Sequence, residues 1–415
     1  MKKHSFWKKI GLFIASIGPG IFLIGYNIGT GSVTTAASIG AKYGMTLVWP
    51  LLLSCIFTYV LIIAFGRYTV VTGQTSLSAF REHFNKGLSL FVLISIVASE
   101  WVAFAGVMGV VTEVVKEWSR PLTATGEGFS MLWISIFFAA LLYYLFWNGK
   151  YRFFEKILTI FVGIMGLSFV LTMFMVITDP AEVIRGLLPK IPQETHASLL
   201  IAGMVGTTMG GVLFVVRSIL VKQKGWTIQD LATEKRDAIV SASIMFLLSV
   251  AVMASAAGTL YLQGRAVDNA IAMVKLLEPL AGRFAISIFV AGIVAAGLSS
   301  MLPHLLLAPW LYADYAGKPM DMKLKYNRAI ALFTASLGLT VPIFGGRPVF
   351  VMIISQALIT IATPLIVLLM IILLNKKELM GEQKVNSAFN RILWIIFLFT
   401  VYMAITGILG IIGTW

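Results

Sequence analysis

Hydrophobic residues along this chain gather into long runs, and shorter polar segments rich in lysine, arginine, glycine and proline separate them. A run of about 20 apolar residues can cross the hydrocarbon core of a bilayer as one helix. The strict alternation of membrane-spanning strands is absent. The pattern therefore predicts an all-α membrane protein with eleven transmembrane helices, with spans at 11–40, 46–72, 88–115, 129–147, 154–178, 197–221, 238–262, 284–314, 327–344, 349–374 and 389–412.

Two of these spans contain residues that disfavour a continuous helix. The middle of Gly18–Gly44 carries Asn27, Gly29, Thr30, Gly31 and Ser32. The segment Gly203–Gly211 reads GMVGTTMGG, and each glycine inside a helix costs roughly 1 kcal/mol relative to alanine. We therefore expect helices 1 and 6 to be broken near the bilayer midplane, where secondary transporters bind their substrates. Close helix packing through small residues is the simpler alternative.

The two broken spans stand at equivalent places in the chain. Spans 1–5 and spans 6–10 each begin with one, which is the arrangement of an inverted five-plus-five repeat. We expect a single transmembrane domain over 1–415, with repeat one at about 7–178, repeat two at about 196–374 and an extra helix at 389–412.

The composition and charge distribution agree with a membrane protein. The chain has 415 residues, of which 59% are hydrophobic and 12% charged, and its mean hydropathy is +0.91. With the N-terminus inside the cell, predicted inner segments carry 21 lysines and arginines and outer segments carry 9. This bias predicts a multi-pass protein of the plasma or inner membrane, with a cytoplasmic N-terminus and an outside C-terminus. No small-residue cleavage site follows the first apolar run, so we expect that run to be retained as a helix.

Several function classes find no support in the residues. The formal net charge of +14 resides in loops and follows topology, which argues against nucleic acid as a partner. There is no cluster of His and Cys at metal spacing, no nucleophile elbow and no Walker motif, so the sequence predicts neither an enzyme nor a nucleotide site. We expect no cofactor. The partners we expect are a divalent cation or a small polar solute and the lipid bilayer, and a monomer is compatible with the sequence.

Several segments are similar to those of one transporter family. They are Gly18–Gly20 (GPG), Ile28–Trp49, Ser218–Lys222 (SILVK), Ala295–Ser300 and Ser355–Pro364. On them the chain resembles the Nramp family of divalent-metal transporters over nearly its whole length. The resemblance implies the LeuT-like fold and alternating access, in which spans 1, 2, 6 and 7 rock against spans 3, 4, 8 and 9.

The resemblance also shows where the chain departs from the family. The family's first-helix motif Asp-Pro-Gly-Asn falls on Gly29, Thr30, Gly31 and Ser32, and its sixth-helix motif Met-Pro-His begins at Gly210. Family members hold manganese or iron with the Asp, the Asn and the Met sulfur, which here are Gly29, Ser32 and Gly210. The negative charge and the soft sulfur, a ligand that favours transition metals, are therefore missing.

The residues near the breaks form the candidate binding site. We expect substrate contacts from Asn27, Gly29, Thr30, Ser32, Thr207, Thr208, Met209, Gly210 and Gln356, and the weak metal-ligand candidates are Ser32, Thr207 and Met209. Gln356, with Ser355, could reach the cavity or bond one helix to another, and we favour the bonding between helices. Freed backbone carbonyls add oxygen ligands, and the glycines at 29 and 210 are expected to widen the site. A wide, neutral, oxygen-lined site suits Mg²⁺ or hydrated Mn²⁺.

Two other functions are compatible with the same residues. A small polar organic solute fits a wide neutral site, and an anion would be favoured by the positive N-terminal ends of the second half-helices. A transport-inactive receptor or scaffold is the alternative of another class, and the absence of a soluble effector domain counts against it.

Charged residues inside predicted spans are functional candidates. Glu100 matches a glutamate of the family and is expected either to act in transport or to pair with Arg67 or Arg217. Arg217 stands where the family has a histidine, and we favour an ion pair for it. His304 is expected to be a core residue. The family's other acids of span 3 fall on Val107 and Val110, so the sequence predicts transport without stoichiometric proton coupling.

Overall fold

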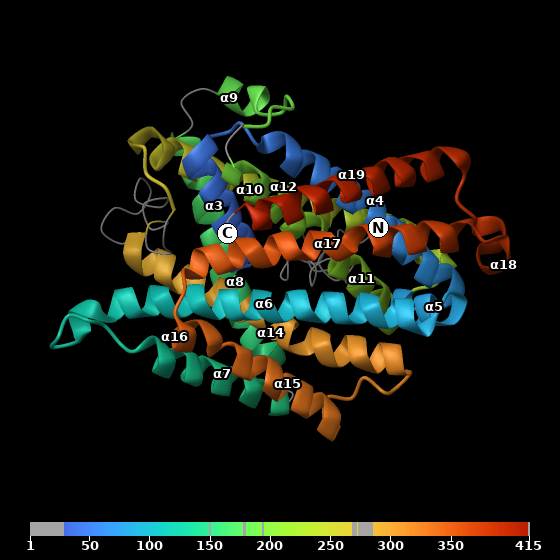
Figure 1. The fold of residues 1–415 in the computed structure, drawn as a ribbon, viewed down its shortest axis with the longest axis horizontal. Coiled ribbons are helices and arrows are strands. Elements are labelled where there is room, and N and C mark those ends of the chain that lie inside the picture. Colours follow the sequence, from blue (N-terminus) through green and yellow to red (C-terminus); the bar gives the residue numbers. More distant parts are fainter. Residues whose placement is uncertain are drawn as a thin grey trace, which may run out of the picture.

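The computed structural model describes residues 29–148, 151–176, 180–192, 195–267, 272 and 285–413, and every regular element in those ranges is helical. The long helices run mostly along the long axis of the molecule (Figure 1). The main helices are α3 (Thr30–Tyr43), α4 (Val48–Thr72), α6 (Lys86–Ser119), α7 (Met131–Asn148), α8 (Tyr151–Val176), α10 (Thr195–Met209), α11 (Gly211–Lys224), α12 (Leu231–Thr259), α14 (Ala285–Ala316), α15 (Lys325–Leu337), α17 (Pro348–Asn375) and α19 (Ser387–Ile412). Four short helices connect them: α5 (Ser76–His83), α9 (Pro180–Arg185), α16 (Thr340–Phe344) and α18 (Lys377–Met380).

The predicted spans agree well with these helices. In the described part of the chain, nine helices are long and apolar enough to cross a membrane. The fifth predicted span coincides with α8, and α3 forms the second half of the first span. The first half of that span lies outside the described residues. The sixth span is broken as predicted, because α10 ends at Met209 and α11 begins at Gly211.

Two boundaries differ from the prediction for identifiable reasons. The seventh span is predicted from residue 238, but α12 begins at Leu231, and one face of its first turns buries the acidic side chains of Glu234 and Asp237. The ninth span is divided between α15 and α16 around Gly338. A Cβ atom at Gly338 would lie 3.0 Å from the ring of Phe104 on α6, so glycine permits a close approach there.

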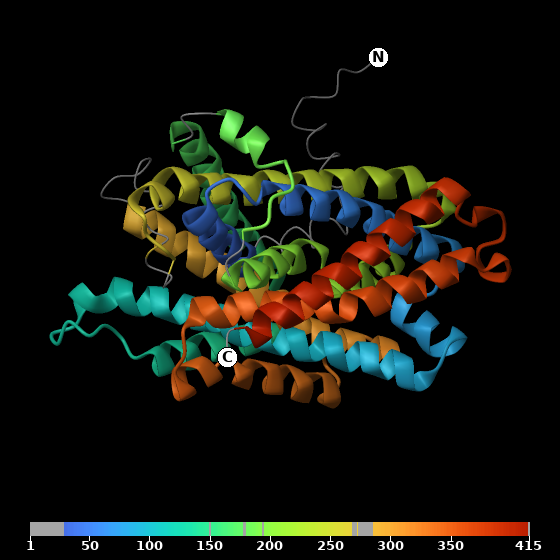
Figure 2. The same cartoon turned by 45° about the horizontal axis from the view of Figure 1, so that its top comes forward.

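The centre of the bundle is built from α3, α6, α10, α14 and α17. The most extensive contacts of α6 are with α14 and α17, and α17 also packs on α10 and α19. Turning the molecule places α12 on one side and the α15–α16 segment on the opposite side (Figure 2). Large apolar side chains on the outer faces are exposed, including Phe91, Trp133, Phe174 and Leu398. A surface of this kind suits contact with lipid rather than water.

Glycines bring α10 and α11 into direct contact with α17. A Cβ atom at Gly206 would overlap the backbone oxygen of Gln356, and one at Gly210 would overlap the side chain of Ile359. The backbone N–H of Gly211, freed by the break, donates to Thr363 Oγ1 at 2.9 Å. These glycines therefore allow close helix packing as well as the helix break, and both features lie on the side that faces α17.

This contact gives a first prediction. Gly206→Ala should lower the free energy of unfolding by about 1–3 kcal/mol, because an added methyl group overpacks a filled interface. Thermal unfolding of the purified protein in detergent measures the change. Gly163→Ala on α8 is the matched control, since no atom lies within 4 Å of its added Cβ. Equal stability of the two variants would contradict the assigned contact.

Candidate functional site

A small cavity lies at the break between α10 and α11, beside the start of α3. Its polar lining consists of Ser32, Thr207, Ser300, His304 and Gln356. Glycines and apolar side chains complete it: Gly29, Gly31, Gly206, Gly210, Val107, Val212, Leu213 and Ile359. The volume open to the centres of water-sized spheres is about 20 Å³, which suffices for about one water molecule.

Five predicted site residues meet at this cavity, namely Gly29, Ser32, Thr207, Gly210 and Gln356. Two others lie elsewhere. The hydroxyl of Thr208 donates to Ser54 Oγ on α4 at 2.6 Å, and Met209 is buried in the apolar core. Neither borders the cavity, so Met209 does not take the place of the family's sulfur ligand there. Asn27 and the side chain of Thr30 lie outside the described residues.

The site is narrower than the sequence suggested. Ile359 on α17 occupies the space next to Gly210, so this glycine does not widen the cavity. The backbone oxygen of Thr208, a carbonyl near the break, accepts a hydrogen bond from Thr58 Oγ1 at 2.7 Å. That carbonyl is therefore engaged within the protein. The side chain of Gln356 approaches Gly31, where an added Cβ would lie 2.7 Å from Nε2.

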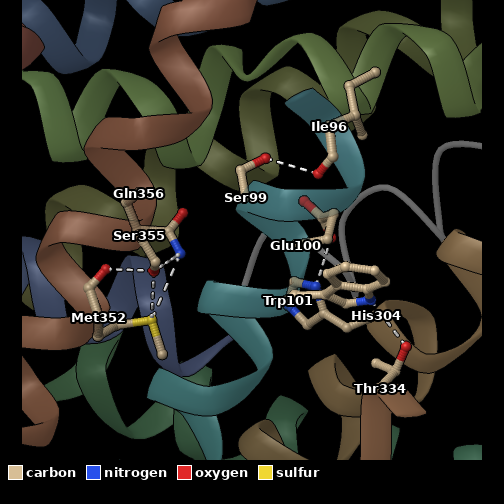
Figure 3. Close-up of polar contacts among 9 residues, drawn as sticks. All are labelled: Ile96, Ser99, Glu100, Trp101, His304, Thr334, Met352, Ser355 and Gln356. Atoms are coloured by element: carbon tan, nitrogen blue, oxygen red, sulfur yellow. Dashed lines mark hydrogen bonds and ion pairs between the residues drawn. The ribbon is translucent and has the colours of Figure 1, made fainter. Parts of the chain in front are cut away.

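Glu100 on α6 pairs with His304 on α14. His304 Nδ1 lies 2.6 Å from Glu100 Oε2, and the Glu100 side chain is fully buried (Figure 3). The expected arginine partners are engaged elsewhere, since Arg67 donates to Gln383 at 3.3 Å. His304 borders the cavity, whereas Glu100 does not. His304 is buried and partnered, as expected of a core residue. The sequence does not predict that its partner is Glu100, and the only signal is an ionisable group in each of two apolar spans.

Figure 3 also shows the polar groups of α17 near this pair. The amide nitrogen of Gln356 lies 3.5 Å from both Met352 Sδ and Ser355 Oγ, at the outer limit for such contacts. Trp101 on α6 donates to Thr334 on α15 at 3.0 Å, which anchors the turn that carries Glu100. The cavity thus has an amide on one side and an imidazole on another.

Arg217 is part of a separate buried cluster. Its guanidinium donates to Glu234 at 3.2 Å and to Asp237, both on α12, and all three side chains are fully buried. The ring of Trp226 lies 5.5 Å from the guanidinium carbon. The ion pair favoured for Arg217 is therefore present. The sequence placed both acidic partners in a loop, because their burial depends on how α12 begins.

The electrostatics of the cavity come from backbone and neutral groups. The first turns of α3 and α11 border it, and neither turn contains an acidic residue. Helix N-termini carry a partial positive charge. Among the described residues, no carboxylate lines the cavity, and no group of three or more His, Cys, Asp or Glu is placed to hold a metal ion. Ligands present at the cavity are thus one imidazole and several neutral oxygens.

A bundle of apolar helices with a polar cavity at a broken helix defines the class of LeuT-fold membrane transporters. The manganese transporter of Eremococcus coleocola superimposes with a TM-score of 0.74 at 14% identity, covering 97% of this chain and 87% of that chain. MhsT in complex with L-phenylalanine gives a TM-score of 0.64 at 12% identity, covering 96% and 98%.

The chain belongs to the Nramp family, whose profile, described as "Natural resistance-associated macrophage protein-like", matches residues 20–410. A relative from Nostoc sp. named "Divalent metal cation transporter MntH" is 27% identical over 402 residues, which cover 91% of this chain and 86% of the relative. A Dictyostelium discoideum relative, "Natural resistance-associated macrophage protein 2 homolog", is 24% identical and covers 98% of this chain and 64% of its own length. The predicted family is confirmed.

The buried cluster gives a second prediction. Arg217→Met should lower the free energy of unfolding by about 3–5 kcal/mol, because it leaves two buried carboxylates without their cation. Thermal unfolding in detergent is the measurement. The triple variant Arg217→Met, Glu234→Gln, Asp237→Asn should recover most of the loss, since it removes all the charges together. Arg120→Ala, in an exposed pair with Glu117, is the control and should change little.

Proposed function

We propose that this protein carries a divalent metal cation across the membrane by alternating access, with the cavity at the α10–α11 break as its central binding site. The observation that carries the proposal is that cavity, where polar groups from helices α3, α10, α14 and α17 converge at a helix break. Membership of the Nramp family and the printed names of the relatives support the same cargo. In this proposal the N-terminus is cytoplasmic.

The ligand set implies weak binding of Mn²⁺ and Mg²⁺. Within the described part of the chain, the lining offers the oxygens of Ser32, Thr207, Ser300 and Gln356 and the imidazole of His304, but no carboxylate. The family's Asp position is Gly29, so one full negative charge is absent. We therefore expect millimolar rather than micromolar affinity, which corresponds to about 4 rather than about 8 kcal/mol of binding free energy.

We further propose that transport proceeds without stoichiometric proton symport. Val107 borders the cavity at a position where the family carries an acid, and Arg217 stands in the histidine position in a fully buried ion pair. The driving force is then the cation gradient together with the membrane potential, at about 2.3 kcal/mol per charge per 100 mV. The Glu100–His304 pair is the remaining candidate for carrying a proton.

A second candidate cargo is a small organic carboxylate. The specific observation in its favour is that the N-terminal turns of α3 and α11 both border the cavity and lack acidic residues. Helix N-termini attract anions, and half-helix N-termini hold the substrate carboxylate in other transporters of this fold. Transport assays with both classes of solute separate the two candidates.

The third prediction concerns cargo and coupling together. Purified protein in liposomes should take up Mn²⁺ and Mg²⁺ at a rate that rises with an inside-negative potential, while an enclosed pH dye reports no acidification. Protein-free liposomes are the control. Uptake of a radiolabelled carboxylate without uptake of either metal would decide for the second candidate. Mn²⁺-dependent acidification that disappears in Glu100→Gln would instead establish proton coupling through Glu100.

The fourth prediction restores the missing charge. Gly29→Asp should tighten Mn²⁺ binding at least about tenfold, or about 1.4 kcal/mol. Gly29 precedes α3 with φ −101° and ψ −172°, an extended conformation that Asp adopts readily and that suits its role as a helix cap. Calorimetry of the folded variant measures the affinity, and Gly29→Asn is the matched uncharged control. Equal affinity in the two variants would place the cation elsewhere.

A further inference from the structure

We propose that His304 binds the transported cation directly through Nε2, and that Glu100 is the positioning residue that holds the imidazole for this purpose. The inference rests on the proposed function, a metal cargo, and assigns the residue of this chain that replaces the family's missing ligands. The imidazole of His304 also determines which metal ion is preferred, because an imidazole ligand favours Mn²⁺ and other transition metals over Mg²⁺.

The geometry of the pair is that of a metal-binding histidine and its supporting carboxylate. His304 Nδ1 lies 2.6 Å from Glu100 Oε2, and the ring borders the cavity while the carboxylate lies behind it. When a carboxylate holds the proton on Nδ1, Nε2 carries a lone pair. Metal-bound histidines almost always use their second nitrogen in this way, and the support fixes the tautomer and the ring orientation.

The neighbourhood of His304 supplies further ligands on the same helix face. Ser300 stands one turn earlier on α14 and borders the same cavity. Residues four apart lie one above the other on a helix. Gln356 and Thr207 contribute oxygens from α17 and α10. One nitrogen with several neutral oxygens suits Mn²⁺, whereas Mg²⁺ prefers oxygen and water ligands alone.

The size of the cavity favours direct ligands. Its volume of about 20 Å³ holds about one water-sized group. A cation at this cavity therefore lies close to protein atoms, which can replace waters of its hydration shell. Mg²⁺ gives up its waters reluctantly, which strengthens the preference for Mn²⁺.

Glu100 also resolves the charge balance of the site. The cavity lining has no carboxylate and is faced by two helix N-termini, which disfavour a cation. The carboxylate of Glu100 stands one side chain behind the lining and is fully buried. Buried charges are screened much less than exposed ones, so Glu100 attracts a divalent cation without contacting it.

The test is pulsed electron paramagnetic resonance of Mn²⁺ bound to the full-length protein in detergent. The chain has 4 histidines, and histidine-specific ¹⁵N labelling distinguishes an imidazole ligand from every other nitrogen. In wild type, the spectrum should show one directly bound histidine nitrogen. The signal should disappear in His304→Gln and persist in His83→Gln, the control, whose histidine on α5 contacts Gln74 outside the cavity.

The affinities of the same variants for Mn²⁺ and Mg²⁺ test the metal selectivity and the role of Glu100. His304→Gln should weaken Mn²⁺ binding about tenfold or more and change Mg²⁺ binding less than about twofold. Glu100→Gln should weaken Mn²⁺ binding by about 10- to 100-fold and alter the nitrogen coupling, which a merely structural role would leave unchanged. The variant Glu100→Gln, His304→Gln removes ring and charge together and serves if the single variant does not fold.

The outcomes test metal transport and the role of His304 as a ligand separately. Mn²⁺ bound without a histidine nitrogen, or with a signal that survives His304→Gln, overturns the inference and leaves metal transport standing. A wild-type protein that binds neither Mn²⁺ nor Mg²⁺ overturns the proposed function and this inference with it. Loss of the signal in His304→Gln alone supports the assignment.

Discussion

The close approach of α10 and α11 to α17 is the constraint on which the rest of the structure depends. At Gly206 the backbone of α10 meets the backbone of α17, and at Gly210 and Gly211 the side chains of Ile359 and Ile366 fill the space that a larger residue would take. An interrupted helix in a membrane must find partners for its free backbone groups inside the protein. Thr363 and Thr58 supply them, from α17 and α4 respectively. The cavity lies beside these close helix contacts, and the same contacts keep it small.

The structure gives its buried carboxylates hydrogen-bonding partners from neighbouring helices. Glu100 meets His304, and Arg217 meets Glu234 and Asp237. Buried charges are tolerated when they are paired and hydrogen-bonded. The two groups differ in where they stand: the arginine cluster joins α11 to α12 away from the cavity, whereas the histidine pair places a ring at the cavity wall. The first group serves stability, and we propose a binding role for the histidine of the second.

Much of the fold could be predicted from the sequence, because apolar runs of membrane length and two glycine-rich breaks are strong local signals. The structure brings Ser32, Thr207 and Gln356 together at one cavity, and their contact with a substrate stays a prediction. The errors concern properties that depend on packing across helices. Nothing local indicates that Ile359 fills the space beside Gly210, or that Thr208 turns toward Ser54. The pairing of Glu100 with His304 joins residues 204 positions apart, so spacing along one helix could not reveal it.

The arginine cluster has a consequence for how the chain enters the membrane during synthesis. An arginine at the centre of a membrane helix costs roughly 2.5–3.5 kcal/mol on the scale measured for insertion, and Arg217, nearer the end of the span Ala197–Lys224, carries part of that cost. The acids that neutralise Arg217 lie on the very next helix in the chain, only 17 and 20 residues later. Helix α11 therefore gains most by leaving the translocon together with α12 as a hairpin. The ion pair therefore favours a particular order of membrane insertion as well as the folded state.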